Sequence, residues 1–190
     1  MKFITAFYFS IASGALSLIA SQQPSESLMK PVNEEPFYVA GYQVQTNNAT
    51  EMSNHGEIGK LWQRYMTENL GAQIPDRSDP RTIVVYSDYA SNEKGDYSYL
   101  LGARVTSVDH LPQGMKFLKV AAGPYAVLTT ARGPVVDVLQ AQWLKIWAMK
   151  PEELGGKRAF VTDYEVYDAR SADPQNAVVE IHIGLAQRTP

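Results

Sequence analysis

A short run near the C-terminal end of the chain combines acidic and aromatic residues in a pattern that could bind an organic cation. Asp163, Glu165 and Tyr167 occupy every second position, and alternation in a β-strand puts the three on one face. Tyr164 and Val166 then lie on the other face. A carboxylate among aromatic rings attracts a cation strongly, because reduced solvent screening strengthens the attraction. We therefore expect Glu165 and Tyr167 to line a binding groove; a solvated strand glutamate is the alternative.

The aromatic composition agrees with such a groove. Beyond position 20 the chain keeps 16 of its 20 aromatic residues, and 13 of these 16 are Tyr or Trp. Their rings can stack on an organic cation while the polar group orients it. We expect Tyr86, Tyr89 and Tyr125 to take part in ligand binding. The alternative for each tyrosine is that it simply suits a half-buried strand.

The last predicted strand offers two more candidates. Glu180 and His182 alternate with isoleucines, so the polar pair shares the face opposite the helix-facing isoleucines. We include both among the ligand-binding candidates. Trp62 and Trp143 lie on the apolar faces of predicted helices, which favours a place in the core over contact with a ligand, although the edge of a groove could use either.

Other chemistries lack support in the sequence. His55, His110 and His182 are the only histidines, they lie in different predicted elements, and the chain has no cysteine. We therefore expect no metal and no cofactor. A nucleophilic triad has no Gly-x-Ser-x-Gly elbow to support it. These absences favour a binding protein over an enzyme.

The N-terminus has the pattern of a secretory signal peptide. Lys2 precedes a run of apolar and small residues from Phe3 to Ala20, so we predict cleavage after about residue 20. The alternative is a membrane anchor, but such a run is near the lower length limit for a span. Residues 21–35 have the composition of a flexible tether. These features predict a periplasmic or secreted protein with no stable membrane span after cleavage.

The net charge argues against nucleic acid as a partner. The whole chain has a formal net charge of −3, and removal of Lys2 with the signal makes it more negative. The sequence predicts no basic surface of the kind that binds the phosphate groups of nucleic acid. The remaining residues, 36–186 with a short tail at 187–190, suffice for one well-buried domain.

The domain reads as two similar halves. The first half predicts a strand from Phe37, a helix on Ile58, Leu61, Trp62 and Tyr65 that starts at an Asn54/Glu57 capping box, and strands at 82–89 and 97–105. The second half predicts strands within 115–130, a helix after Gly133-Pro134 that ends at Pro151, and strands at 160–167 and 177–185. A Tyr-x-x-Tyr motif occurs in each half, as Tyr86 to Tyr89 and as Tyr164 to Tyr167.

These elements predict an α+β fold. Each half is a β-α-β-β unit, and the two are expected to pack about a pseudo-two-fold axis, with an antiparallel sheet, two long helices and a central ligand groove. Such a groove suits a small molecule.

Six short motifs in this order resemble one known family. They are Leu61-Trp62, Tyr86 to Tyr89, Tyr99-Leu100-Leu101-Gly102, Gly123-Pro124-Tyr125-Ala126-Val127, Asp163-Tyr164-Glu165-Val166-Tyr167 and Glu180-Ile181-His182-Ile183. The pattern is similar to the gyrase-inhibitor-like effector-binding domain of AraC- and MerR-type regulators, and closest to the stand-alone integron-cassette effector-binding proteins. The resemblance covers about residues 36–186.

The resemblance implies a duplicated fold whose groove binds small cationic, aromatic or amphipathic compounds. In that family a glutamate in a Glu-x-Tyr setting sits in the groove, and Glu165 with Tyr167 matches it. The chain is expected to differ from the regulators, because the sequence predicts an export signal, and not a DNA-binding domain, before the effector module. The expected function is therefore an exported protein that captures such a compound.

Two alternatives stay open at this point. Some relatives hydrolyse strained cyclopropane-bearing compounds, and Glu165, alone or together with Glu180, could activate water for that reaction. Haem-binding proteins of the SOUL type look similar in their duplicated fold, with His182 or His55 as a candidate axial ligand.

Overall fold

The computed structural model describes residues 29–187. Its strands are β1 (Val32–Glu34), β2 (Phe37–Thr46), β3 (Thr82–Ser87), β4 (Tyr97–Val105), β5 (Lys116–Val120), β6 (Gly123–Thr129), β7 (Arg158–Tyr167) and β8 (Glu180–Leu185). Its helices are α1 (Asn48–Glu51), α2 (Ile58–Thr67), α3 (Val135–Ala148) and α4 (Pro151–Leu154), with short 3-10 turns at Leu70–Gln73 and Ala169–Ser171. The predicted signal peptide and most of the predicted tether lie outside the described residues.

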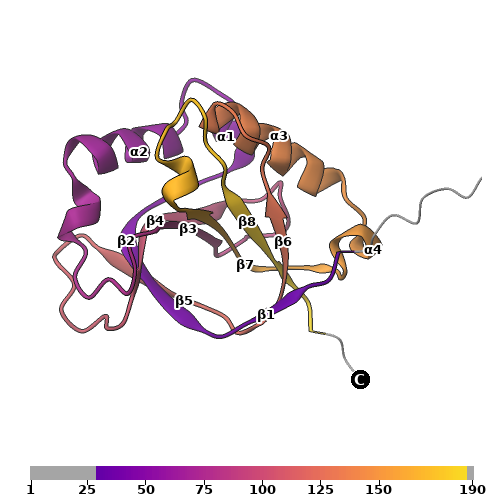
Figure 1. Ribbon diagram of the computed structural model, residues 1–190, viewed down its shortest axis with the longest axis horizontal. Coiled ribbons are helices and arrows are strands. Elements are labelled where there is room, and N and C mark those ends of the chain that lie inside the picture. Colours follow the sequence, from indigo (N-terminus) through magenta and orange to yellow (C-terminus); the bar gives the residue numbers. More distant parts are fainter. Residues whose placement is uncertain (1–28, 188–190) are drawn as a thin grey trace, which may run out of the picture.

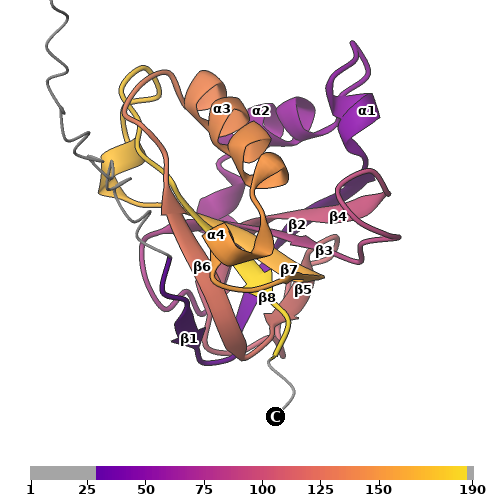
Figure 2. The ribbon, with the colours of Figure 1, turned by 90° about the vertical axis from the view of Figure 1, so that its right-hand side faces the viewer.

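The strand order confirms the predicted duplication. All eight strands form one antiparallel sheet in the order β1-β6-β8-β7-β3-β4-β2-β5. The order reads symmetrically from its centre, where β7 pairs with β3: β8, β6 and β1 follow on one side, and β4, β2 and β5 on the other. Helices α2 and α3 both lie over the same face of the sheet (Figures 1 and 2). The fold is therefore α+β, with two β-α-β-β halves.

The sheet curls strongly (Figure 1), and two paired glycines permit part of this bend. Gly41 of β2 lies opposite Gly102 of β4. A Cβ atom at Gly41 would lie 2.1 Å from the carbonyl oxygen of Leu101, and one at Gly102 would lie 1.9 Å from that of Ala40. Only residues without a side chain fit such a close approach of two backbones.

Both faces of the curled sheet are apolar. The helix-covered face holds two clusters, one under α2 around Leu61, Tyr65 and Leu101, and one under α3 around Ile146 and Ile181. The opposite face encloses a third cluster, which includes Phe37, Val85, Leu100, Tyr125 and Tyr164. The cores therefore leave the space between the two helices and the centre of the sheet for a site.

Helix α2 begins differently from the prediction. Its N-cap is Glu57, without a capping bond from its own side chain, so the predicted Asn54/Glu57 capping box is wrong. The carboxylate of Glu51, in α1, instead accepts hydrogen bonds from the backbone nitrogens of Glu57 (2.9 Å) and Ile58 (3.2 Å). A carboxylate at a helix N-terminus is favourable for the helix dipole, and here a neighbouring short helix supplies it.

Two boundaries also differ. Residues 32–34, which we assigned to the tether, form the edge strand β1 and pair with β6. Helix α3 ends at Ala148, ahead of Pro151, and Pro151 begins α4. Proline fits the first turn of a helix because it lacks only an N–H that would have no partner there. Within the described residues, no helix is long and apolar enough to cross a membrane.

The two Tyr-x-x-Tyr motifs are not related by the symmetry of the fold. Tyr86 pairs with Asp163 on the helix-covered face, whereas Tyr164 pairs with Val85 on the opposite face. A two-fold axis that relates α2 to α3 maps each face of the sheet onto itself. Tyr86 and Tyr164 lie on different faces, so they are not equivalent positions.

Candidate ligand-binding site

A large cavity lies between the helices and the centre of the sheet. Its volume is about 1430 Å³, which is ample for an organic molecule of drug size. Helix α2 contributes Trp62, α3 contributes Trp143, and the central strands contribute Tyr86, Tyr99, Glu165 and Tyr167. Both halves of the duplicated fold therefore build this cavity.

Glu165 is the acidic centre of the cavity. Its side chain is almost fully buried, with 2% exposed, and three aromatic side chains donate hydrogen bonds to it. The hydroxyl of Tyr86 (2.8 Å) and Nε1 of Trp143 (2.7 Å) bond to Oε1, and the hydroxyl of Tyr167 (2.7 Å) bonds to Oε2. The predicted neighbours Glu165, Tyr167 and Tyr86 are thus brought together.

The protonation states in the site follow from this burial. Burial raises the pKa of Glu165, while the hydrogen bonds from Trp143, Tyr167 and Tyr86 oppose that rise. Burial, assisted by the nearby Glu165, also raises the pKa of Tyr86 and Tyr167 well above the ordinary tyrosine value. The tyrosines are therefore neutral donors, and Glu165 is the group among them that can carry a negative charge.

The rings around Glu165 are in close contact; Tyr86 packs edge to face with Tyr99 and Trp143, and Trp62 is tilted against Tyr167. Tyr86 lies 5.1 Å from Tyr99 and 5.0 Å from Trp143 between ring centroids, and Trp62 lies 5.0 Å from Tyr167. Nε1 of Trp62 donates to the hydroxyl of Tyr99 at 2.7 Å. These contacts fix the orientation of the rings, so the wall is organised before any ligand arrives.

The two tryptophans belong both to the core and to the site. Trp62 and Trp143 pack against the core clusters, as expected, and both also line the cavity, where Trp143 donates to the carboxylate. The apolar face of each helix does point toward the sheet, as predicted. The cavity lies in that same space, because the helices cover the sheet without filling the gap above its centre.

A second polar cluster lies along β7 from Glu165. Asp163 is fully buried and accepts from the hydroxyl of Tyr89 (2.6 Å), from Nη2 of Arg158 (2.7 Å) and from the backbone nitrogen of Gly184 (2.8 Å). Tyr89 and Arg158 also line the cavity. Sequence reasoning placed Tyr89 in the groove and Asp163 on the face of Glu165, but it missed Arg158.

Tyr125 does not belong to the site. It is buried on the opposite face of the sheet, where its hydroxyl lies 2.7 Å from the hydroxyl of Thr162 and 3.1 Å from the carbonyl oxygen of Ala121. The structure therefore does not bring Tyr125 to the cavity where we expected it. Strand β6 carries Tyr125 and Val127 on the face away from the helices, as its pairing with Gly184 and His182 of β8 shows.

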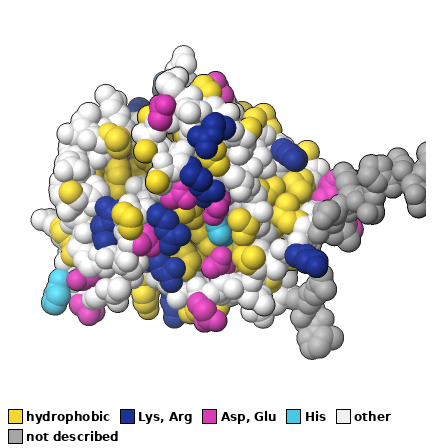
Figure 3. All heavy atoms as spheres, in the orientation of Figure 1, with side chains coloured by type: hydrophobic (Ala, Val, Ile, Leu, Met, Phe, Trp, Pro, Cys, Tyr) yellow, Lys and Arg dark blue, Asp and Glu magenta, His cyan; other side chains and the backbone are white. Residues whose placement is uncertain are grey.

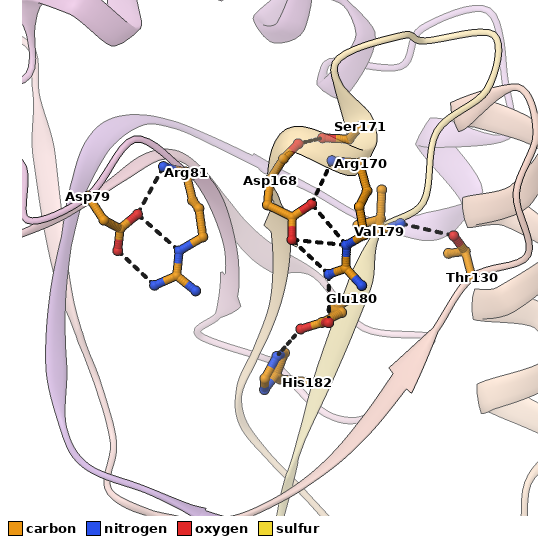
Figure 4. A network of polar contacts seen from close by, with 9 residues as sticks. All are labelled: Asp79, Arg81, Thr130, Asp168, Arg170, Ser171, Val179, Glu180 and His182. Atoms are coloured by element: carbon orange, nitrogen blue, oxygen red, sulfur yellow. Dashed lines mark hydrogen bonds and ion pairs between the residues drawn. The ribbon is translucent and has the colours of Figure 1, made fainter.

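Glu180 and His182 are also misplaced by the prediction. They share the face opposite the helix-facing isoleucines, as expected, but that face points away from the cavity. Arg170 bridges Asp168 (2.7 Å) and Glu180 (2.6 Å), next to His182 (Figure 4). His182 stacks on Tyr164 with 4.2 Å between ring centroids, and burial lowers its pKa although Glu34 and Glu180 oppose this effect. Acidic and basic side chains intermingle on the molecular face drawn in Figure 3.

The described part of the chain holds no set of side chains placed to ligate a metal ion, and no histidine placed to ligate a haem in the cavity. Within residues 29–187, no group of three or more His, Asp or Glu side chains could hold a metal ion. The residues that line the cavity include no histidine. His182 faces the other side of the sheet and His55 lies in an exposed turn, so neither is placed to ligate a haem in this cavity.

Comparison with known proteins assigns the class. Residues 32–185 match the sequence model of the integron-associated effector binding protein family, and the chain belongs to that family. The YobU protein of Bacillus subtilis (strain 168) is 30% identical over 147 residues, which cover 77% of this chain and 90% of YobU. The family match confirms the predicted resemblance and supports binding of a small molecule.

Two solved structures share the fold. The integron cassette protein VCH_CASS2 from the mobile metagenome of Vibrio cholerae has a TM-score of 0.62 and 27% identity, with 84% of this chain and 97% of that chain covered. SAV2435, solved with bound tetraphenylphosphonium, has a TM-score of 0.67 and 14% identity, with 83% and 93% covered. The curled sheet with two helices over one face is therefore shared with both proteins.

Proposed function

We propose that this protein captures cationic aromatic or amphipathic compounds in the cavity, with Glu165 as the counter-charge. The observation that carries this proposal is a buried carboxylate surrounded by neutral aromatic donors in a cavity large enough for an organic molecule. An organic cation is the ligand whose charge this arrangement complements.

The energetic argument rests on the burial of Glu165. Without a partner, ionisation of the buried side chain is disfavoured, as the raised pKa shows. A cation that enters the cavity stabilises the ionised form at short range, where solvent screening is weak. Because three donors already hold the carboxylate in place, little reorganisation is needed on binding.

The walls and the rim suit a ligand with a large apolar body. Trp62, Trp143 and Tyr86 present aromatic surfaces close to the carboxylate, and aromatic faces attract organic cations. Met52, Met66, Val136 and Leu144 line the cavity and are more than half exposed. An apolar rim favours an amphipathic ligand whose body extends from the charged end toward the opening. The tetraphenylphosphonium bound to SAV2435 is a cation with a large aromatic body.

A thermal-shift screen of the protein against cationic dyes, neutral aromatic compounds and haem tests this proposal, because a ligand that binds the native state raises Tm. We expect cations to raise Tm and the Glu165→Gln variant to lose this response. Equal stabilisation of both proteins by cationic and neutral compounds would contradict the role of the charge.

Hydrolysis is a second candidate function, favoured by one observation. A buried carboxylate with a raised pKa at a cavity is a common feature of general acids and bases. Glu180 cannot assist, because it faces the other side of the sheet, so Glu165 would have to activate water alone. Turnover of a cyclopropane-bearing substrate that is lost in Glu165→Gln would support this candidate; no turnover across a substrate panel leaves capture of the ligand as the function.

We further propose that the protein is exported, on the sequence pattern of residues 1–20. N-terminal sequencing of protein recovered from the periplasm or medium of a bacterial host tests the proposal. A mature N-terminus near residue 21 supports it, whereas an intact Met1 in the cytoplasmic fraction contradicts it. That nucleic acid is not a partner stays a prediction from the net charge.

A further inference from the structure

A bulge in β7 places an arginine in the wall of the cavity. Arg158 and Asp163 are five residues apart, and in a regular strand an odd separation puts two side chains on opposite faces. The pairing of β7 with β8 shifts its register between these two residues. As a result, Nη2 of Arg158 reaches Oδ2 of Asp163 at 2.7 Å, on the face of the sheet that carries Glu165.

The bulge contains backbone strain. Phe160 lies within it and has a φ of 51°, a conformation that costs energy for a bulky side chain. The ring of Phe160 packs 4.3 Å from the guanidinium carbon of Arg158 and 5.6 Å from the ring of Tyr89. Bulges of this kind redirect a side chain, often beside a functional site, and the side chain that this one redirects is Arg158.

Arg158 has a buried guanidinium nitrogen without a hydrogen-bond partner among the described residues. Its side chain is only 9% exposed, and among residues 29–187 no acceptor bonds to its buried Nε. A buried N–H without a partner costs free energy, because the group has lost its hydration. Because the Arg158 side chain lines the cavity, a ligand acceptor recovers that loss when the guanidinium shifts to present Nε to it.

We propose that Arg158 is a second polar anchor of the cavity and selects ligands that carry a neutral hydrogen-bond acceptor as well as a positive charge. The proposal rests on the proposed function, since it assumes that the cation meets Glu165. The guanidinium of Arg158 is bound to Asp163. Asp163 and Glu165 are two residues apart on one face of the strand, and side chains at that spacing are separated by about 7 Å. The acceptor should therefore lie about that far from the cationic group.

The charges of Asp163, Glu165 and Arg158 determine which kind of acceptor group is favoured. Asp163 and Glu165 together carry two negative charges when ionised, against the single positive charge of Arg158. An added carboxylate would face a wall with an excess of negative charge. A carbonyl, ester, amide or ether oxygen accepts the hydrogen bond without that penalty, so the ligand class is a cation that carries such a group.

Three fluorescent dyes with one cationic ring system test this proposal by fluorescence anisotropy. Tetramethylrosamine has no acceptor on its pendant ring, tetramethylrhodamine methyl ester has a neutral ester there, and tetramethylrhodamine has a carboxylate. For the unmodified protein we expect the ester to bind about three- to tenfold more tightly than the rosamine, the effect of one net hydrogen bond. A ratio near one would overturn the proposal without any variant.

Two variants assign the effect to Arg158. The double variant Arg158→Met/Asp163→Asn removes the donor without leaving a buried charge unpaired, and we expect its ester preference to fall to about one. Asp163→Asn alone frees the guanidinium charge, so the carboxylate dye should gain affinity relative to the rosamine. Arg104→Met is the matched control, because Arg104 packs over Phe37 on the other face of the sheet; it should keep the preference. An ester preference that survives in the double variant would overturn the role of Arg158.

Glu165→Gln separates this proposal from the proposed function. If all three dyes lose affinity in that variant but the ester has no advantage in the unmodified protein, the cation site stands and the acceptor site falls. If no dye binds, both proposals fail together.

Discussion

Nε1 of Trp143 donates a hydrogen bond of 2.7 Å to Oε1 of Glu165. This contact joins α3 to the C-terminal part of β7 and links two residues that line the cavity. It also orients the carboxylate, because Tyr86 bonds to the same oxygen and Tyr167 to the other. The helix thus contributes directly to the polar centre of the site.

Replacing Trp143 by Phe keeps a ring but removes the donor. We expect the free energy of unfolding at neutral pH to fall by about 2 kcal/mol, as for loss of a hydrogen bond to a charged group, and cation binding to weaken. Chemical denaturation and a binding titration check both effects. Trp147→Phe is the control, because Trp147 packs beside Trp143, with 6.4 Å between ring centroids; an equal loss of affinity there would contradict a specific role for the indole of Trp143.

The raised pKa of Glu165 predicts a pH dependence of stability. The unfolded protein releases this proton at the ordinary pKa and the folded protein at a higher one, so the folded state binds more protons between the two values. The stabilising contribution is complete below the ordinary glutamate pKa and is lost as pH rises through the raised pKa. We expect the unmodified protein to lose stability relative to Glu165→Gln over that range.

Denaturation of both proteins at a series of pH values measures this difference. A difference that does not vary with pH would show that the pKa of Glu165 is not shifted by folding. A saturating organic cation should reduce the difference at high pH, because it stabilises the ionised carboxylate.

Two tyrosine variants distinguish the effects of the two faces of the sheet. Tyr86→Phe removes a donor to Glu165, and we expect about a threefold or greater loss of cation affinity. Tyr125→Phe removes a buried hydroxyl contact on the opposite face, so it should lower the free energy of unfolding by about 1 kcal/mol and leave affinity unchanged. Calorimetric titration of both variants checks the pair; weakened binding in Tyr125→Phe would place the ligand elsewhere.

The same reasoning applies to the polar network around β8. Arg170 binds Glu180 at 2.6 Å on the face away from the cavity, so Glu180→Gln should leave cation affinity unchanged within twofold. The His182→Ala variant should show the same absorption spectrum with added haem as the unmodified protein. A Soret shift that depends on His182 would contradict the placement of the binding site.

Much of the fold could be predicted because the sequence patterns are local. Alternation correctly assigned Asp163, Glu165 and Tyr167 to one face of β7, and the repeated order of elements predicted the symmetric sheet. Alternation does not tell which face the helices cover. Both faces of this sheet are apolar and buried, so Tyr125 and His182 could not be excluded from the site by pattern alone.

The contacts that were missed depend on tertiary structure. Arg158 reaches the cavity only because the strand is irregular between residues 158 and 163, and no local signal marks that bulge. Trp143 follows the apolar face of its helix, as a core residue also would. Whether such a residue fills the core or lines a cavity depends on the distance between helix and sheet, which the spacing of apolar residues does not encode.

The central claim is that the charge of Glu165 selects cations, and a pair of ligands with the same shape and opposite charge tests it most directly. Isothermal titration calorimetry of the protein with tetraphenylphosphonium and with tetraphenylborate makes the comparison. We predict that the cation binds at least about tenfold more tightly than the anion, and that Glu165→Gln removes most of this difference. Equal binding of the two ions, or a preference for the cation that survives in Glu165→Gln, would contradict the account.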